Sequence, residues 1–364
     1  MNFYEEWLAD SKKAQHAVEN APALARGKDL KWIETPQDFR IAMLIGEQVG
    51  FPTMGTSLMK AEIPAGCHSG KHQHGEEGMH FLSGTGFSVI DGRRYDWKPG
   101  TTIHVPFMAE HQHFNTGSDA AVYVSAMSAD LDLYVKLGRL NQLEEKGKNA
   151  ANLDATYGKQ TSQYDESGKR RLALHSEDWI DENARREEQR KAAAEAAVAA
   201  SAHGNGHGHE HHGHDHGHEG HAHGHEGHGA AVGHQGHRHG AIYILMGGSE
   251  SLTDETNDFQ AKAVAITNIF EETPKTRSHS HTHTEAMLYV LEGSGYSEVD
   301  GKRYDWVAGD AVHVPPKMTM HEHFNNSDGR TRTLRIEFGA RYFYEALWNG
   351  FHKVEHRLTA EAIA

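Results

Sequence analysis

The sequence predicts a mainly β protein built from two copies of one antiparallel β domain. Short apolar runs separated by Gly and Pro recur from residue 39 to 128 and again from residue 242 to 338, a pattern typical of an all-β barrel or sandwich. The second observation is an internal repeat, because FSVIDGRRYDW at 87–97 reappears as YSEVDGKRYDW at 296–306. We therefore expect two barrels, with N-terminal, connecting and C-terminal helices.

The elements of the first half follow in order. Apolar residues at helical spacing over 3–20 predict one amphipathic helix, inside an N-terminal extension that we place at 1–37. The first barrel is expected at 38–130, where Asp91-Gly92 predicts a two-residue hairpin turn.

A connector that we read as helical is expected at 131–202. Residues 131–147 read as one helix, and residues 177–201 are rich in the strong helix formers Ala, Glu and Arg.

The second half begins with a low-complexity segment at 203–240. It contains 15 of the 32 histidines, most of its other residues are glycine, and it has almost nothing to bury. We expect this linker to be disordered without a ligand. A second barrel at 241–340 and a C-terminal helix at 341–364 complete the prediction.

Composition excludes several classes of function. The chain has 364 residues and a formal net charge of −15, which disfavours nucleic acid as a partner. It has no apolar run long enough for a transmembrane helix, and its polar N-terminus does not resemble a secretory signal. The single cysteine, Cys67, excludes an intrachain disulfide. We expect a cytoplasmic protein with no membrane partner.

Histidine spacing marks the candidate site. His72 and His74 are two residues apart, so on a strand they point to the same face, and His111 lies on a later strand. The repeat provides a second set, His281, His283 and His321. We expect each set to hold a metal ion.

The same residues resemble the two motifs of the cupin superfamily. Gly66, five residues and His72-x-His74 match the first motif, and Gly92, Gly100, Pro106 and His111-x-x-x-Asn115 match the second. The chain therefore resembles a bicupin, which implies two antiparallel jelly-roll barrels with a metal site in the mouth of each.

One departure from the cupin pattern narrows the expected chemistry. Most metal cupins carry a glutamate four or five residues after the second histidine, where this chain has Gly78 and Met79, and Met287 and Leu288 in the repeat. Glu76, Glu77 and Glu285 stand too early. The remaining three-histidine site is similar to gentisate and salicylate 1,2-dioxygenases, which implies Fe(II), O₂ and ring cleavage of a small hydroxylated aromatic.

Four further histidines recur in both halves: His104, His113, His313 and His323. They are candidates for orienting the metal ligands or for acid–base catalysis, and a purely structural role is the alternative.

Other readings stay open. Ni, Zn, Mn and Cu are alternatives to Fe(II), and the His-rich linker is a candidate Ni or Zn binder. A non-oxygenase cupin (isomerase, decarboxylase or lyase) and a metal-storage protein are the competing functions. A homo-oligomer is expected from the resemblance to bicupins.

Overall fold

The structure is a computed structural model. The residues it describes are 2–137, 139–150, 157, 162–173, 180–181, 187–188, 190–196, 198, 239–246, 261, 263–277, 281–339, 341 and 344. Almost all of the His-rich linker and of the expected C-terminal helix lies outside these residues.

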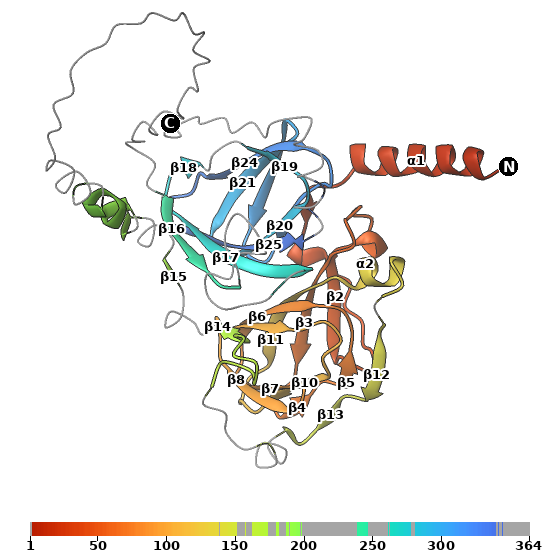
Figure 1. The fold of residues 1–364 in the computed structure, drawn as a ribbon, viewed down its shortest axis with the longest axis vertical. Coiled ribbons are helices and arrows are strands. Elements are labelled where there is room, and N and C mark those ends of the chain that lie inside the picture. The colour runs from red at the N-terminus through yellow and green to blue at the C-terminus, as the bar shows by residue number, and fades with distance from the viewer. Residues whose placement is uncertain are drawn as a thin grey trace, which may run out of the picture.

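Helix α1 (Phe3–Glu19) projects away from the rest of the molecule (Figure 1). A capping box begins it: the Asn2 side chain accepts the backbone N–H of Glu5, and the Glu5 carboxylate accepts the N–H of Asn2. The prediction of a helix over 3–20 is confirmed.

The first β unit consists of two antiparallel sheets. The inner sheet faces the second unit and has the strand order β14 (Leu172–Ala173), β9 (Thr102–Val105), β6 (Glu77–Ser83), β11 (Ala121–Met127), β3 (Ser57–Ile63) and β2 (Arg40–Ile45). The outer sheet has the order β12 (Asn141–Glu144), β5 (Lys71–Gln73), β10 (His111–Asn115), β4 (Cys67–His68) and β13 (Gly147–Lys148). In addition, β7 (Gly86–Ile90) pairs with β10, and β8 (Arg93–Trp97) pairs with β7. The 3₁₀ helices are Gly27–Asp29 and Glu47–Val49.

The second β unit repeats this arrangement. Its inner sheet has the order β1 (Leu24–Ala25), β23 (Ala311–Val314), β20 (Ala286–Glu292), β25 (Thr331–Phe338), β17 (Val264–Glu272), β16 (His239–Ile244) and β15 (Ile180–Asp181). Its outer sheet contains β18 (Thr276–Arg277), β24 (Thr319–Asn325), β21 (Ser294–Val299), β22 (Lys302–Val307) and β19 (His281–His283). The mainly β fold with two antiparallel units is as predicted.

The predicted hairpin turn lies between β7 and β8. Asp91 and Gly92 both have positive φ angles, 47° and 78°, as a two-residue turn of this kind requires. Asp300 and Gly301 repeat this geometry in the second unit.

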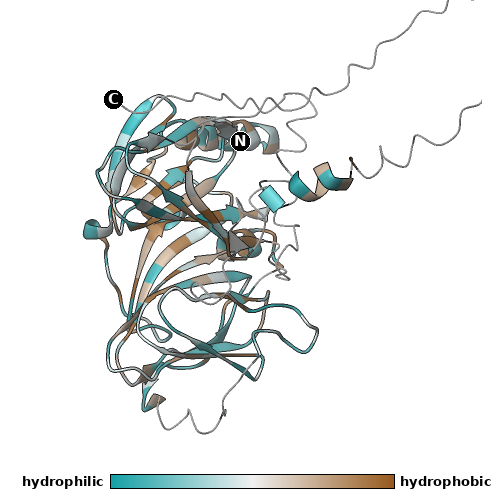
Figure 2. Cartoon of the chain, turned by 90° about the vertical axis from the view of Figure 1, so that its left-hand side faces the viewer, coloured by the Kyte–Doolittle hydropathy of each residue, from teal (hydrophilic) through white to brown (hydrophobic). Residues whose placement is uncertain are grey.

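The two inner sheets pack face to face, and one hydrophobic cluster spans them. Leu44, Leu58 and Val124 of the first unit join Ile266 and Ile336 of the second in this cluster, and all five are buried. Hydrophobic strands accordingly run through the middle of the molecule (Figure 2). Successive side chains of a strand point to opposite faces of the sheet, so a strand such as β6 can face both this cluster and the interior of its own unit.

The connector differs from its prediction. Helix α2 covers only Ala129–Tyr134, and the strand β12 and the start of β13 lie within 131–147, which was expected to be one helix. The physical reason is tertiary pairing: β12 covers the edge of β5, with Gln142 opposite His72, and this pairing overrides the local helix propensity. Within 177–201, β15 precedes described residues that are helical, namely 187–188, 190–196 and 198.

Among the described residues, no helix combines the length and the apolar character needed to cross a membrane.

Candidate metal centre

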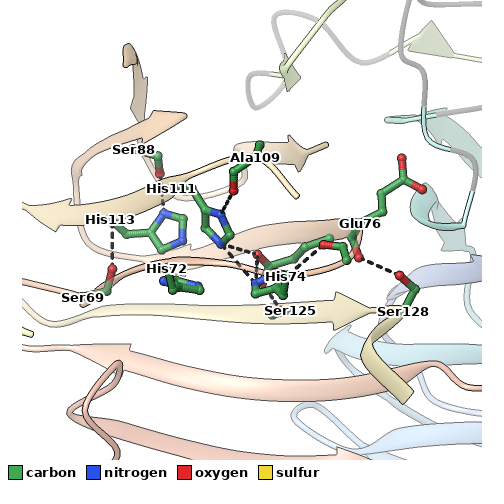
Figure 3. A network of polar contacts seen from close by, with 12 residues as sticks. Ser69, His72, His74, Glu76, Ser88, Ala109, His111, His113, Ser125 and Ser128 are labelled. Atoms are coloured by element: carbon green, nitrogen blue, oxygen red, sulfur yellow. Dashed lines mark hydrogen bonds and ion pairs between the residues drawn. The ribbon is translucent and has the colours of Figure 1, made fainter. Parts of the chain in front are cut away.

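Neighbouring strands bring the predicted histidines of the first unit together. His72 on β5 lies opposite His111 in the register with β10, and His74 follows two residues after His72. All three side chains are buried, at 1–2% exposure. Figure 3 shows these rings pointing toward one another between the strands.

The three rings form a tight cluster. Their centroids lie 4.0 Å apart for His72 and His111, 4.6 Å for His74 and His111, and 5.1 Å for His72 and His74. One ligand nitrogen from each ring lies within 4.8 Å of the others, close enough to share one metal ion.

Hydrogen bonds define which nitrogen each ring presents. Each Nδ1 donates to a backbone carbonyl, that of Gly70 for His72 at 2.9 Å, that of Gly75 for His74 at 2.8 Å, and that of Ala109 for His111 at 2.8 Å. In the neutral ring, Nε2 is then the unprotonated nitrogen with a lone pair for a metal.

Burial keeps these imidazoles neutral. It lowers the pKa of His74, and it lowers the pKa values of His72 and His111 to well below the ordinary value of 6.5. Repulsion among the clustered rings is the second cause for His72 and His111. Neutral imidazoles are the form that binds a metal.

Glu77 lies beside the cluster, at a position where motif spacing predicted no carboxylate. Its Oε2 atom lies 3.6 Å from Nε2 of both His74 and His111. Ser125 donates a hydrogen bond to the other oxygen, whereas no donor among the described residues reaches Oε2. Burial raises the pKa of Glu77 to about 7.

Strand alternation explains why motif spacing missed Glu77. It is the first residue of β6, and it shares the face of Met79 and Phe81, which line the interior of the first unit. Glu76 belongs to the opposite face and points to the second unit. Reading the period of two backwards from Phe81 would have identified Glu77.

His113 joins the edge of the cluster. One of its ring nitrogens lies within 4.8 Å of ligand atoms of Glu77 and His111. Its Nδ1 atom is 2.7 Å from the Ser88 hydroxyl, which also accepts the indole N–H of Trp97. Burial lowers the pKa of His113 to about 3, so this ring is neutral as well. In the second unit, His323, Ser297 and Trp306 repeat the hydrogen bonds.

The structure does not bring His104 or His313 into the histidine clusters. His104 contacts Glu76 through Nε2 at 2.7 Å, and His313 contacts Glu285 at 3.1 Å, both at the interface between the units.

The second unit contains part of an equivalent cluster. His281 lies opposite His321 in the strand register, as His72 lies opposite His111, although the His281 side chain is outside the described residues. The rings of His283 and His321 have centroids 4.3 Å apart, and each Nδ1 donates to a backbone carbonyl. The repeat equivalent of Glu77 is Ala286, so the two centres differ in their carboxylate.

Sequence reasoning also missed a buried pair beside the first cluster. Tyr123 on β11 lies 6.0 Å from His113 between ring centroids, and its hydroxyl lies 3.5 Å from the Asp38 carboxylate. Burial, followed by the charge of Glu77, raises the pKa of Asp38 to about 7. Alternation along β11 places Tyr123 and Ser125 on one face and could have signalled both.

A divalent metal ion fits the donor set of the first unit. The Nε2 atoms of His74 and His111 lie only 3.1 Å apart, and both carry lone pairs, so they repel each other unless a cation lies between them. The buried Oε2 of Glu77 offers a further oxygen donor beside them. Imidazole and carboxylate together suit Fe, Mn, Zn, Ni and Cu.

Two segments of the chain, residues 59–127 and 269–337, match the cupin domain family. Over 48 residues the chain is 38% identical to an uncharacterised protein of Methanocaldococcus jannaschii, covering 13% of this chain and 38% of that protein. Over 74 residues it is 35% identical to a 5-aminosalicylate 1,2-dioxygenase of a Comamonas species, covering 20% of each. Both matches span well under two thirds of these relatives.

Solved structures share the fold over most of the chain. The salicylate 1,2-dioxygenase of Pseudoaminobacter salicylatoxidans, determined with gentisate, has a TM-score of 0.53 at 12% identity, covering 97% of this chain and 84% of that one. The oxalate decarboxylase of Lactobacillus farciminis, determined with formate, has a TM-score of 0.55 at 12% identity, covering 87% and 86%. The fold thus occurs with two different chemistries.

Proposed function

The chain carries two cupin domains, and we propose that it is a metal-dependent cupin enzyme: an Fe(II)-dependent dioxygenase that uses O₂ to cleave the ring of a small hydroxylated aromatic. The observation that carries the proposal is the cluster of His72, His74 and His111, whose Nε2 atoms are unprotonated and converge in the first unit. The similarity to a 5-aminosalicylate dioxygenase supports the substrate class.

The residues of the first unit would have separate roles in the reaction. His72, His74 and His111 would hold the metal on one face, which leaves other positions open. When bound, Fe(II) would supply a site at which O₂ and an aromatic hydroxyl meet and exchange charge.

Glu77 and His113 are the candidates for moving protons. With a pKa of about 7, the Glu77 carboxylate can accept the proton that an aromatic hydroxyl loses on binding, at Oε2. His113 stays neutral and is fixed by Ser88, so it can orient a substrate without adding charge to the site.

A second candidate function is favoured by Glu77. A buried glutamate beside three histidines is what the cupin pattern of metal-dependent decarboxylases requires, and its presence weakens the argument that the site is of the three-histidine type. We therefore keep decarboxylation of a small carboxylic acid as the alternative, with Mn as the metal to test first.

One experiment separates the two functions. The protein is loaded with Fe(II) or with Mn(II), and O₂ uptake and CO₂ release are measured with hydroxylated aromatics, including 5-aminosalicylate and gentisate, and with oxalate. O₂ uptake coupled to loss of an aromatic supports the dioxygenase. CO₂ release from oxalate without net O₂ uptake supports the alternative, and neither activity would refute both.

A further inference from the structure

Glu76 and Glu285 occupy equivalent positions in the repeat, and both side chains leave their own unit. They are 209 residues apart, as are His74 and His283. Glu76 lies between His74 and Glu77, and Glu285 lies two residues after His283. Both are buried, at 5% and 1% exposure.

Each carboxylate accepts backbone N–H groups of the other unit. Glu76 Oε2 accepts the N–H of Ala263 and, at 3.2 Å, that of Val264 at the start of β17. Glu285 Oε2 accepts the N–H of Met54 at 2.7 Å. Met54 and Ala263 are also 209 residues apart, so the two contacts are related by the same internal symmetry.

Histidines fix the second oxygen of each carboxylate. Arg171 donates to His104 Nδ1 at 2.7 Å, so Nε2 of the neutral ring carries the proton and donates it to Glu76 Oε1 at 2.7 Å. In the second unit, His313 Nε2 lies 3.1 Å from Glu285 Oε1, and its Nδ1 lies 3.3 Å from the carbonyl of Pro22.

The main chain of Glu76 is hydrogen-bonded as well as its side chain. Its carbonyl accepts the N–H of Ser128 at 3.2 Å, and the Ser128 hydroxyl donates to Asp132 at 2.6 Å. Because β6 begins with the next residue, the position of Glu76 sets where Glu77 enters the histidine cluster. Figure 3 shows Glu76 and Ser128 at the end of the cluster nearest the second unit.

We propose that Glu76 and Glu285 are positioning residues, through which each β unit holds the metal-ligand segment of the other. The inference rests on the proposed metal centres. The second unit would orient His74 and Glu77 through its hydrogen bonds to Glu76, and the first unit would orient His283 through its hydrogen bond to Glu285. Residues that support metal ligands in this way commonly change metal affinity by about 10–100-fold when they are removed.

The test is a Co(II) titration of the full chain, followed by ligand-field absorption. His321→Ala leaves the first centre as the reporter, His111→Ala leaves the second, and the chain with both substitutions measures the linker, which is identical in every variant. We expect Glu76→Ala to weaken Co(II) binding at the first centre by about 10–100-fold and leave the second unchanged. Glu285→Ala should do the reverse.

The band shape distinguishes positioning from general stability. Glu76→Ala should shift the absorption band of the first centre, because Glu77 moves relative to the histidines, whereas a purely structural contact would leave the band unchanged. Equal weakening of both centres, or of neither, would overturn the proposal. Glu76→Gln keeps one oxygen for the Ala263 N–H but faces His104 with an N–H₂ group, and it should give an intermediate loss. It replaces Glu76→Ala if that variant does not fold.

The outcome also separates this inference from the proposed metal site. If the unsubstituted chain binds no Co(II) beyond the linker's share, the metal centres themselves are refuted. If it binds normally and the Glu76 variants bind equally well, only the positioning role fails.

Discussion

The Glu77 carboxylate lies 3.6 Å from the Nε2 atom of His111, inside the first unit and away from solvent. This contact places an acidic group in a cluster that motif spacing describes as three histidines alone. It also supplies the one buried carboxylate oxygen of the cluster that lacks a donor among the described residues.

Glu77→Gln should lower the affinity of the first centre for Fe(II) or Mn(II) at least about tenfold, because it removes the negative charge that the Glu77 carboxylate places beside the bound cation. Anaerobic calorimetry in the His321→Ala background measures it. Glu62→Gln, which alters a surface ion pair with Arg40, is the matched control. Metal affinity equal to that of the control would contradict the prediction.

Metal binding at pH 7 should release about half a proton from the first centre, because Glu77 has a pKa of about 7 and a cation beside it favours its ionised form. The histidines should release none, since their pKa values are already lowered by burial. Calorimetry in two buffers of different ionisation enthalpy gives the number, after subtraction of the His111→Ala signal. Release of two or three protons would mean that the imidazoles are charged in the metal-free protein.

Asp38 should make the metal-free protein less stable as the pH rises. Its pKa is about 7 when folded and close to 3.8 when unfolded, so the folded state holds the proton more tightly between these values. The contribution of protonated Asp38 to the free energy of unfolding is fully present below pH 4. It is lost as the pH rises through 7, by up to about 4 kcal/mol. The unfolding free energy of Asp38→Asn relative to the wild type should therefore rise over this range. A difference that is constant with pH would contradict the prediction.

Ser88→Ala should lower the free energy of unfolding by about 1–3 kcal/mol, because it leaves the buried Trp97 N–H and a nitrogen of His113 without their shared hydroxyl. Ser297→Ala removes the equivalent hydroxyl in the second unit and should cost a similar amount. Urea unfolding measures both, with the exposed Ser118→Ala as control. A loss no greater than that of the control would show that water replaces the hydroxyl.

The histidine spacing and the hairpin turn were readable from sequence because each is local. His72-x-His74 and the Asp91-Gly92 turn each lie within a few residues, and strand geometry converts such spacing directly into direction. The same local logic, applied as strand alternation from Phe81, would have included Glu77. A search for a glutamate four or five residues after the second histidine passes over Glu77, because the segment between His74 and β6 is short.

The interface was not readable because its partners are far apart in the chain. Glu76 meets Ala263, 187 residues away, and nothing near either residue marks the contact. The helix expected over 131–147 failed for a related reason, since Asn141–Glu144 pairs with the edge of β5. Long-range backbone pairing outweighs a local propensity of a few tenths of a kcal/mol per residue.

The central claim is that the first unit carries the reactive centre, and O₂ uptake by matched variants tests it most directly. Fe(II)-loaded wild type, His111→Ala and His321→Ala are compared on the aromatic substrate that gives the highest rate. The account predicts that His111→Ala abolishes O₂ uptake and that His321→Ala retains it. Wild-type O₂ uptake by His111→Ala would contradict it.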